Sequence, residues 1–113
     1  MVDAGLRDLG SQEPLTAAVD TSASDTTVIA ATAGKRIAVV YWSLGASGAQ
    51  AVRFQSTQSD VAGKQLTGKI RLNTTQSNSG WNPDGHFIAA AGELLNLEID
   101  GGTVSGYICY IVI

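Results

Sequence analysis

The chain has few of the residues that build catalytic and metal sites, with one cysteine and one histidine among 113 residues. A single cysteine cannot form an intramolecular disulfide, and the sequence contains no HxH or CxxC pair of zinc ligands. The Gly-Lys pairs at 34–35 and 63–64 lack the other residues of a phosphate-binding loop. His86 and Cys109 could pair as base and nucleophile, but the apolar neighbours of Cys109 favour a packing role. We therefore expect no enzyme activity, no metal and no cofactor.

Charged residues are also scarce, at 15% of the chain against roughly 25% in average proteins. Residues 1–20 hold four acids and one base, a net charge of −3, whereas residues 21–113 hold six acids and six bases. A surface that follows nucleic-acid phosphates needs excess lysine and arginine, so nucleic acid is not an expected partner. No apolar run is long enough for a membrane span, and the first residues do not follow the signal-peptide pattern. We expect that the protein is synthesised in a host cytoplasm and does not associate with a membrane.

The sequence is instead rich in short β-favouring runs separated by glycine-containing turns. Apolar and polar side chains alternate most clearly in residues 66–72, 95–99 and 104–112, and no stretch has helical periodicity with caps. The other expected strands cover residues 27–32, 37–44, 49–56 (with a bulge near Val52) and 86–91. This pattern predicts an all-β fold, a jelly-roll-like antiparallel β-sandwich of seven or eight strands formed by residues 23–113.

Residues 1–22 are expected to form an extended N-terminal arm. Gly10 and Pro14 prevent a long helix, and the apolar residues are too scattered for a strand. A frayed terminus and a docking arm are both compatible with this segment. Because a purely solvated tail needs no leucines, Leu6, Leu9 and Leu15 favour an arm that docks onto a partner.

Two of the expected strands, 37–44 and 104–113, are apolar on both faces. A two-layer sandwich buries only one face of each sheet, so the outer face of these strands is expected to be buried against a second copy of the chain. Tyr41 and Trp42 are neighbours, so one of them faces the core and the other faces outward. The candidate residues for this interface are Tyr41, Trp42, Tyr107 and Ile111.

The loop at residues 78–85 combines oxygen-bearing side chains with Trp81. Clustered oxygens bind calcium and an aromatic ring stacks on sugars, so an ion or sugar site is one interpretation. However, Asp84 is the only carboxylate in the loop, and the same residues are ordinary turn formers. We favour the turn, with Trp81 as a lid on the end of the sandwich.

Three short motifs lie at expected turns and strands of the sequence: a Gly-Lys-x-Ile turn at 34–37, an Ala-Gly-Glu-x-Leu turn at 91–95 and a closing Gly-Tyr-x-x-Tyr strand at 106–110. With these motifs, residues 25–113 resemble the small virion proteins of tailed bacteriophages. The resemblance implies a jelly-roll decoration (cement) protein that forms a homotrimer on the outer surface of the capsid, where its partner is the major capsid protein. It also implies that the N-terminal arm reaches across capsomer boundaries.

The expected function is therefore that of a structural virion protein, located on the capsid surface, that stabilises the particle. The alternative is a carbohydrate- or receptor-binding β-sandwich module of a virion fibre or tail, which would use the Trp81 loop.

Overall fold

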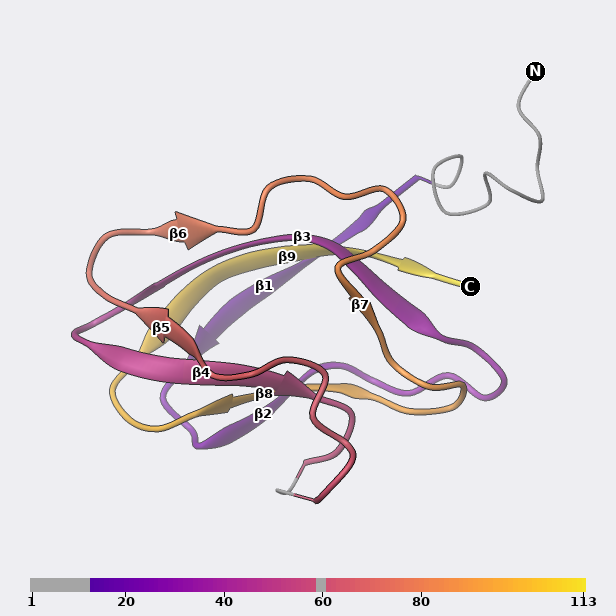
Figure 1. The fold of residues 1–113 in the computed structure, drawn as a ribbon, viewed down its shortest axis with the longest axis horizontal. Coiled ribbons are helices and arrows are strands. Elements are labelled where there is room, and N and C mark those ends of the chain that lie inside the picture. Colours follow the sequence, from indigo (N-terminus) through magenta and orange to yellow (C-terminus); the bar gives the residue numbers. More distant parts are fainter. Residues whose placement is uncertain (1–12, 59–60) are drawn as a thin grey trace.

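The computed structural model describes residues 13–58 and 61–113, and within them it contains strands and no helix. Two β-sheets pack face to face (Figure 1). The strands are β1 (Leu15–Thr21), β2 (Asp25–Ile29), β3 (Ile37–Ala46), β4 (Gln50–Gln55), β5 (Ile70–Leu72), β6 (Ser77–Asn78), β7 (Phe87–Ile88), β8 (Leu95–Ile99) and β9 (Val104–Val112).

The strand order is that of a jelly roll. The first sheet has the order β1-β9-β3-β6, with β7 also paired to β3, and the second sheet has the order β2-β8-β4-β5. All pairs are antiparallel, and the chain crosses repeatedly from one sheet to the other. When β6 and β7 are counted as one edge strand, each sheet has four strands, and two such sheets connected in this way form the double Greek key of a jelly roll. The predicted all-β sandwich is confirmed.

One edge of the first sheet is an interrupted strand. β6 pairs with β3 at Ser43 and Leu44, and β7 pairs with β3 at Ala38 and Val39. Between β6 and β7, the backbone amides of residues 79, 82 and 86 donate to carbonyls of β3. The loop predicted at residues 78–85 therefore runs along β3. With β6 and β7 on either side of it, the described residues contain nine strands, above the predicted seven or eight.

The core lies between the sheets and is formed by alternate residues of the long strands. Its largest fully buried side chains include Phe54, Leu44, Leu95, Leu97 and Ile108. Phe54 and Phe87 pack with ring centroids 4.9 Å apart. Burying aliphatic and aromatic side chains of this size stabilises the fold by about 1.5–3 kcal/mol each relative to leaving them exposed.

The bulge predicted near Val52 is wrong, because β4 pairs with β8 in unbroken register from Val52 to Gln55. The apolar and polar residues of β4 drift in phase because both of its faces are covered: Phe54 and Gln55 are each fully buried. The first sheet instead has a bulge in β3, between Val39 and Tyr41. One extra residue there reverses the alternation, so that Val39 and Trp42 both face the core.

The strand predicted at residues 66–72 is shorter in the structure, where β5 covers only Ile70–Leu72. The preceding residues leave the sheet, because the amides of Leu66 and Thr67 both point to the carbonyl of Phe54. The Thr67 hydroxyl also accepts a hydrogen bond from the Phe54 amide (3.1 Å). The turn after β4 therefore uses the backbone groups that a longer strand would need.

The arm predicted over residues 1–22 is wrong for its last third, because residues 15–21 form β1, which pairs along its whole length with β9. Ala17 and Val19 pack against the core, and Val19 is buried. Leu15, a predicted docking residue, is the first residue of this strand and is half exposed. The sandwich therefore begins at Leu15 and not at residue 23. Leu6 and Leu9 lie outside the described residues.

Candidate functional site

An exposed cluster of three aromatic rings lies on the outer face of the first sheet. The Tyr41 ring contacts Trp81, with centroids 6.5 Å apart, and Tyr107, with centroids 5.8 Å apart. Trp81 is 56% exposed and Tyr107 is 39% exposed. We call the surface formed by Tyr41, Trp81 and Tyr107 the aromatic face.

Two strands and one loop place these rings together. In the β3–β9 register, Tyr41 is opposite Cys109 and Ser43 is opposite Tyr107, so these four side chains share the outer side of the sheet. Trp81 reaches the same side from the β6–β7 connection, where the neighbouring amide of Asn82 donates to the Val40 carbonyl. The three rings are therefore fixed by backbone pairing.

The surroundings of the aromatic face carry almost no charge. Among the residues of β1, β3 and β9 that share the outer side in the strand register, the only charged one is Asp20; the others around the rings include Thr16, Ala18, Ser43, Ser105 and Cys109. A side-chain hydrogen bond with Tyr41 raises the pKa of Tyr107, so this phenol stays neutral across the physiological range. A neutral, partly exposed aromatic surface is typical of a contact region for another protein.

The four predicted interface residues are separated by the structure. Tyr41 and Tyr107 lie on the aromatic face, whereas Trp42 packs against the core, which confirms that the two neighbours face opposite sides. Ile111 is on the outer side but only 2% exposed. Ala38 lies opposite Ile111 and is in turn contacted by the loop at Gly85, since a Cβ there would lie 3.4 Å from the Ala38 Cβ. The chain itself covers this end of the sheet.

The loop at 78–85 is a structural turn whose polar side chains bind its own backbone. The Asn82 side chain accepts from the amide of Asp84 and donates to the carbonyl of Gly85, and the Asn78 side chain accepts from the amide of Gly80. The His86 ring is 2.8 Å from the Gly80 carbonyl oxygen. The prediction that Trp81 is a lid on the end of the sandwich is wrong, because Trp81 contacts Tyr41 on the outer face of the first sheet.

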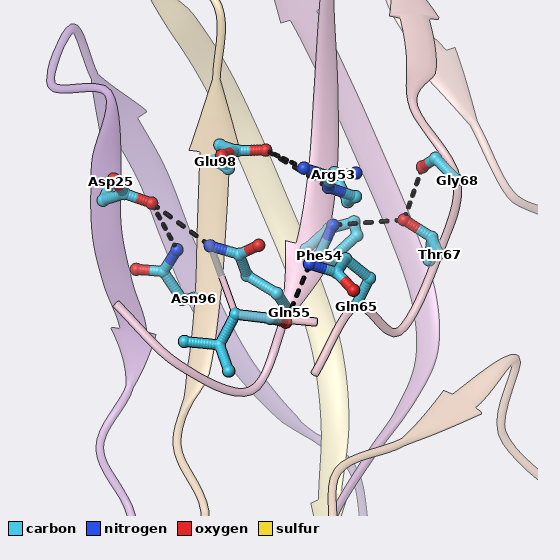
Figure 2. Close-up of polar contacts among 10 residues, drawn as sticks. Asp25, Arg53, Phe54, Gln55, Gln65, Thr67, Gly68, Asn96 and Glu98 are labelled. Atoms are coloured by element: carbon cyan, nitrogen blue, oxygen red, sulfur yellow. Dashed lines mark hydrogen bonds and ion pairs between the residues drawn. The ribbon is translucent and has the colours of Figure 1, made fainter. Parts of the chain in front are cut away.

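The outer face of the second sheet is different, because it holds a network of charged and amide groups (Figure 2). The Asp25 carboxylate accepts from the side-chain amides of Gln55 (3.2 Å) and Asn96 (3.0 Å), which are both fully buried. Beside them, Arg53 and Glu98 form an ion pair of 2.8 Å. Charged side chains across this face make it a poor surface for apolar contact, in contrast to the aromatic face.

Replacing Asp25 with alanine is expected to destabilise the fold by about 1–2 kcal/mol, because the buried amides of Gln55 and Asn96 lose their acceptor. Urea unfolding followed by tryptophan fluorescence measures the change. Asp84→Ala, in an exposed turn, is the matched control and is expected to stay within about 0.5 kcal/mol of the unmodified protein. Equal stability of the two variants would contradict a structural role for the Asp25 network.

Comparison with known proteins finds no matching family model and no matching curated protein. Within the described residues, no helix is long and apolar enough to span a membrane. The same residues contain no group of three or more histidine, cysteine or acidic side chains placed to hold a metal ion.

Proposed function

We propose that the protein is a non-catalytic structural component of a virion, which binds the outer surface of a phage capsid and self-associates through the aromatic face. The observation that carries the proposal is the exposed, uncharged Tyr41–Trp81–Tyr107 cluster on a sheet whose other face is fully used by the core. A homotrimer, as in the proteins that the sequence resembles, would bury this cluster in each copy.

The position of the chain ends supports attachment from one end of the sandwich. Leu15, where β1 begins, is opposite Tyr110 near the C-terminus, and both lie at the same end of the first sheet (Figure 1). The described part of the first strand therefore begins at this end of the sandwich. In our proposal the segment before residue 13, with Leu6 and Leu9, contacts the major capsid protein, while the aromatic face joins the copies beside one another.

Tyr107→Asp is expected to dissociate the oligomer into folded monomers, because it places an unpaired charge in the aromatic contact, next to the Tyr41 ring. The loss in self-association should be at least about 100-fold, which is the cost of burying an uncompensated charge. Light scattering during size-exclusion chromatography at micromolar concentration gives the mass directly. Because Tyr107 is partly exposed, the thermal midpoint of the variant should remain high enough for a folded monomer.

Val61→Asp is the matched control for this experiment. The exposed fraction of Val61, 42%, is similar to the 39% of Tyr107, but Val61 lies in the loop between β4 and β5. This variant should keep the mass of the unmodified oligomer. The half-buried Cys109 thiol provides a second measurement, since it lies on the outer side of β9 and should react more slowly with a thiol reagent in the oligomer. An unmodified chain that stays monomeric on concentration would contradict self-association.

Attachment to a capsid is tested on the parent particle. Cryo-electron microscopy of the virion should show a jelly-roll density on the outer capsid surface, with the Leu15 end directed toward the capsid. Density of this shape in a tail or fibre, and none on the capsid, would overturn the decoration function and support the fibre or tail alternative.

A further inference from the structure

An open cleft of about 820 Å³ lies at the end of the sandwich opposite the chain termini. It is formed where the β3–β4, β5–β6 and β8–β9 connections meet, at the left of Figure 1. These three connections are far apart in the sequence and come together only through the jelly-roll topology. Neither capsid attachment through the N-terminal segment nor self-association through the aromatic face uses this cleft.

Most of the side chains that line the cleft can form hydrogen bonds. They include Ser47, Gln50, Arg71, Asn73, Ser77 and Asp100. Arg71 is exposed and has no ion-pair partner in the described part of the chain, whereas the Asp100 carboxylate is held by the Ala51 amide (2.9 Å). One guanidinium and one carboxylate leave the lining without net charge, so the cleft has no electrostatic preference for a polyanion or a divalent cation.

The floor of the cleft is shaped by Gly102 in the β8–β9 turn. Gly102 has a φ of 64°, and a Cβ at this position would lie 2.2 Å from Gln50 Oε1 and 2.8 Å from Ser47 Oγ. The missing side chain lets Gln50 lie directly over the turn. The Gln50 Nε2 donor is buried and has no acceptor among the residues that the structure describes. A rotation of the terminal amide toward the cleft would give this donor to a ligand oxygen.

The geometry points to the cleft as a binding site for a neutral carbohydrate. Sugar hydroxyls both donate and accept hydrogen bonds, which matches a lining of amides, hydroxyls, one carboxylate and one guanidinium. Sites for apolar small molecules are lined mostly by hydrophobic and aromatic side chains, whereas this cleft has no aromatic ring and only Ala49 and Leu72 as hydrophobic side chains. Bound peptides use an exposed sheet edge or pockets for apolar anchors, and this cleft is formed by turns and polar side chains.

This inference deepens the carbohydrate-binding alternative and moves its site from the Trp81 loop to the cleft, and it does not depend on capsid attachment. If the protein attaches through the Leu15 end, the cleft faces away from the capsid. Several copies on one particle would then present the site repeatedly, so that weak individual contacts combine into a strong one.

The test is a nitrogen-15 NMR titration of the full chain with glucose, galactose, N-acetylglucosamine, lactose and maltose. At least one sugar should shift the amides of Gly48, Gly101 and Gly102 with a dissociation constant on the order of 1 mM. The Arg71→Ala variant should raise this constant about tenfold, since it removes a charged hydrogen-bond donor from an exposed position. Thr75→Ala, a milder change in the same lining, should raise it about threefold.

Lys69→Ala is the matched control, because Lys69 is an exposed cation just before β5 that is absent from the lining of this cleft. The affinity of the Lys69→Ala variant for the sugar should be the same as that of the unmodified protein. Titrations with inorganic phosphate and tetraglycine complete the experiment. Three results would each overturn the proposal. The first is that no sugar shifts the cleft amides at 50 mM, roughly fifty times the expected constant. The others are sugar shifts confined to the Trp81 loop, and a response that depends on Arg71 but occurs only with phosphate or tetraglycine. Loss of virion attachment would not affect the proposal.

Discussion

Gly106→Ala is expected to destabilise the protein by about 4 kcal/mol or more, which is a large fraction of the stability of an ordinary domain. Gly106 is the third residue of β9, has a φ of 145° and lies opposite Leu44 of β3. A Cβ at this position would lie 1.9 Å from the backbone oxygen of Ser43. The neighbouring strand cannot give way, because Ser43 and Leu44 also pair with β6 on their other side. Thermal unfolding followed by circular dichroism should show a midpoint lower by about 20 °C.

Gly68→Ala is the control for this prediction. Gly68 precedes β5, has no positive φ, and has no atom within 4 Å of the position that a Cβ would take. Its variant should remain within about 0.5 kcal/mol of the unmodified protein. A Gly106→Ala variant that melts within a few degrees of the Gly68→Ala variant would show that β3 and β9 are less closely packed than the structure describes.

Two N-terminal deletions are expected to separate folding from capsid binding. Removing residues 2–12 should leave a folded sandwich, because the described contacts of the first sheet begin at Leu15, but it should abolish attachment to capsids. Removing residues 2–21 should prevent stable folding. It eliminates β1, removes Val19 from the core and leaves β9 as an unprotected edge strand. Circular dichroism and co-sedimentation with capsids measure the two properties separately.

Point variants separate the two contributions within the N-terminal segment. Leu6→Ser with Leu9→Ser should weaken attachment more than Asp3→Asn with Asp8→Asn, since buried apolar area contributes more to affinity than exposed charge. A protein without residues 2–12 that decorates capsids as well as the full chain would place the attachment surface on the sandwich itself.

The long strands could be predicted from the sequence because their alternation is strong. β8 and β9 lie within a residue of the expected ranges, and the opposite orientations of Tyr41 and Trp42 follow from the two-residue period of a strand. β1 was missed because it has an alanine on each face: Ala17 points inward and Ala18 points outward. The alternation of apolar and polar side chains is therefore weak. If Ala17 is counted as apolar and Ala18 as neutral, Leu15, Ala17 and Val19 form one apolar face and predict the strand.

The sites were harder to predict than the strands, because they depend on contacts between distant segments. Trp81 joins Tyr41 only because the β6–β7 connection follows β3 through backbone hydrogen bonds, which have no signal in the side chains. Ile111 could not be distinguished from Tyr107 by pattern alone, since the loop at Gly85 covers one end of the sheet and not the other. The cleft combines three turns, none of which has a binding motif by itself.

The pairing of β1 with β9 joins the beginning of the sandwich to the last strand of the chain. During synthesis, the first sheet cannot close until β9 has left the ribosome, because Leu15 needs Tyr110 as its partner. Contacts of such long range make folding slow, and until they form, β1 and β3 both remain without their shared neighbour β9. Chains that stop before β9 therefore lack both the Tyr107 ring of the aromatic face and a finished first sheet.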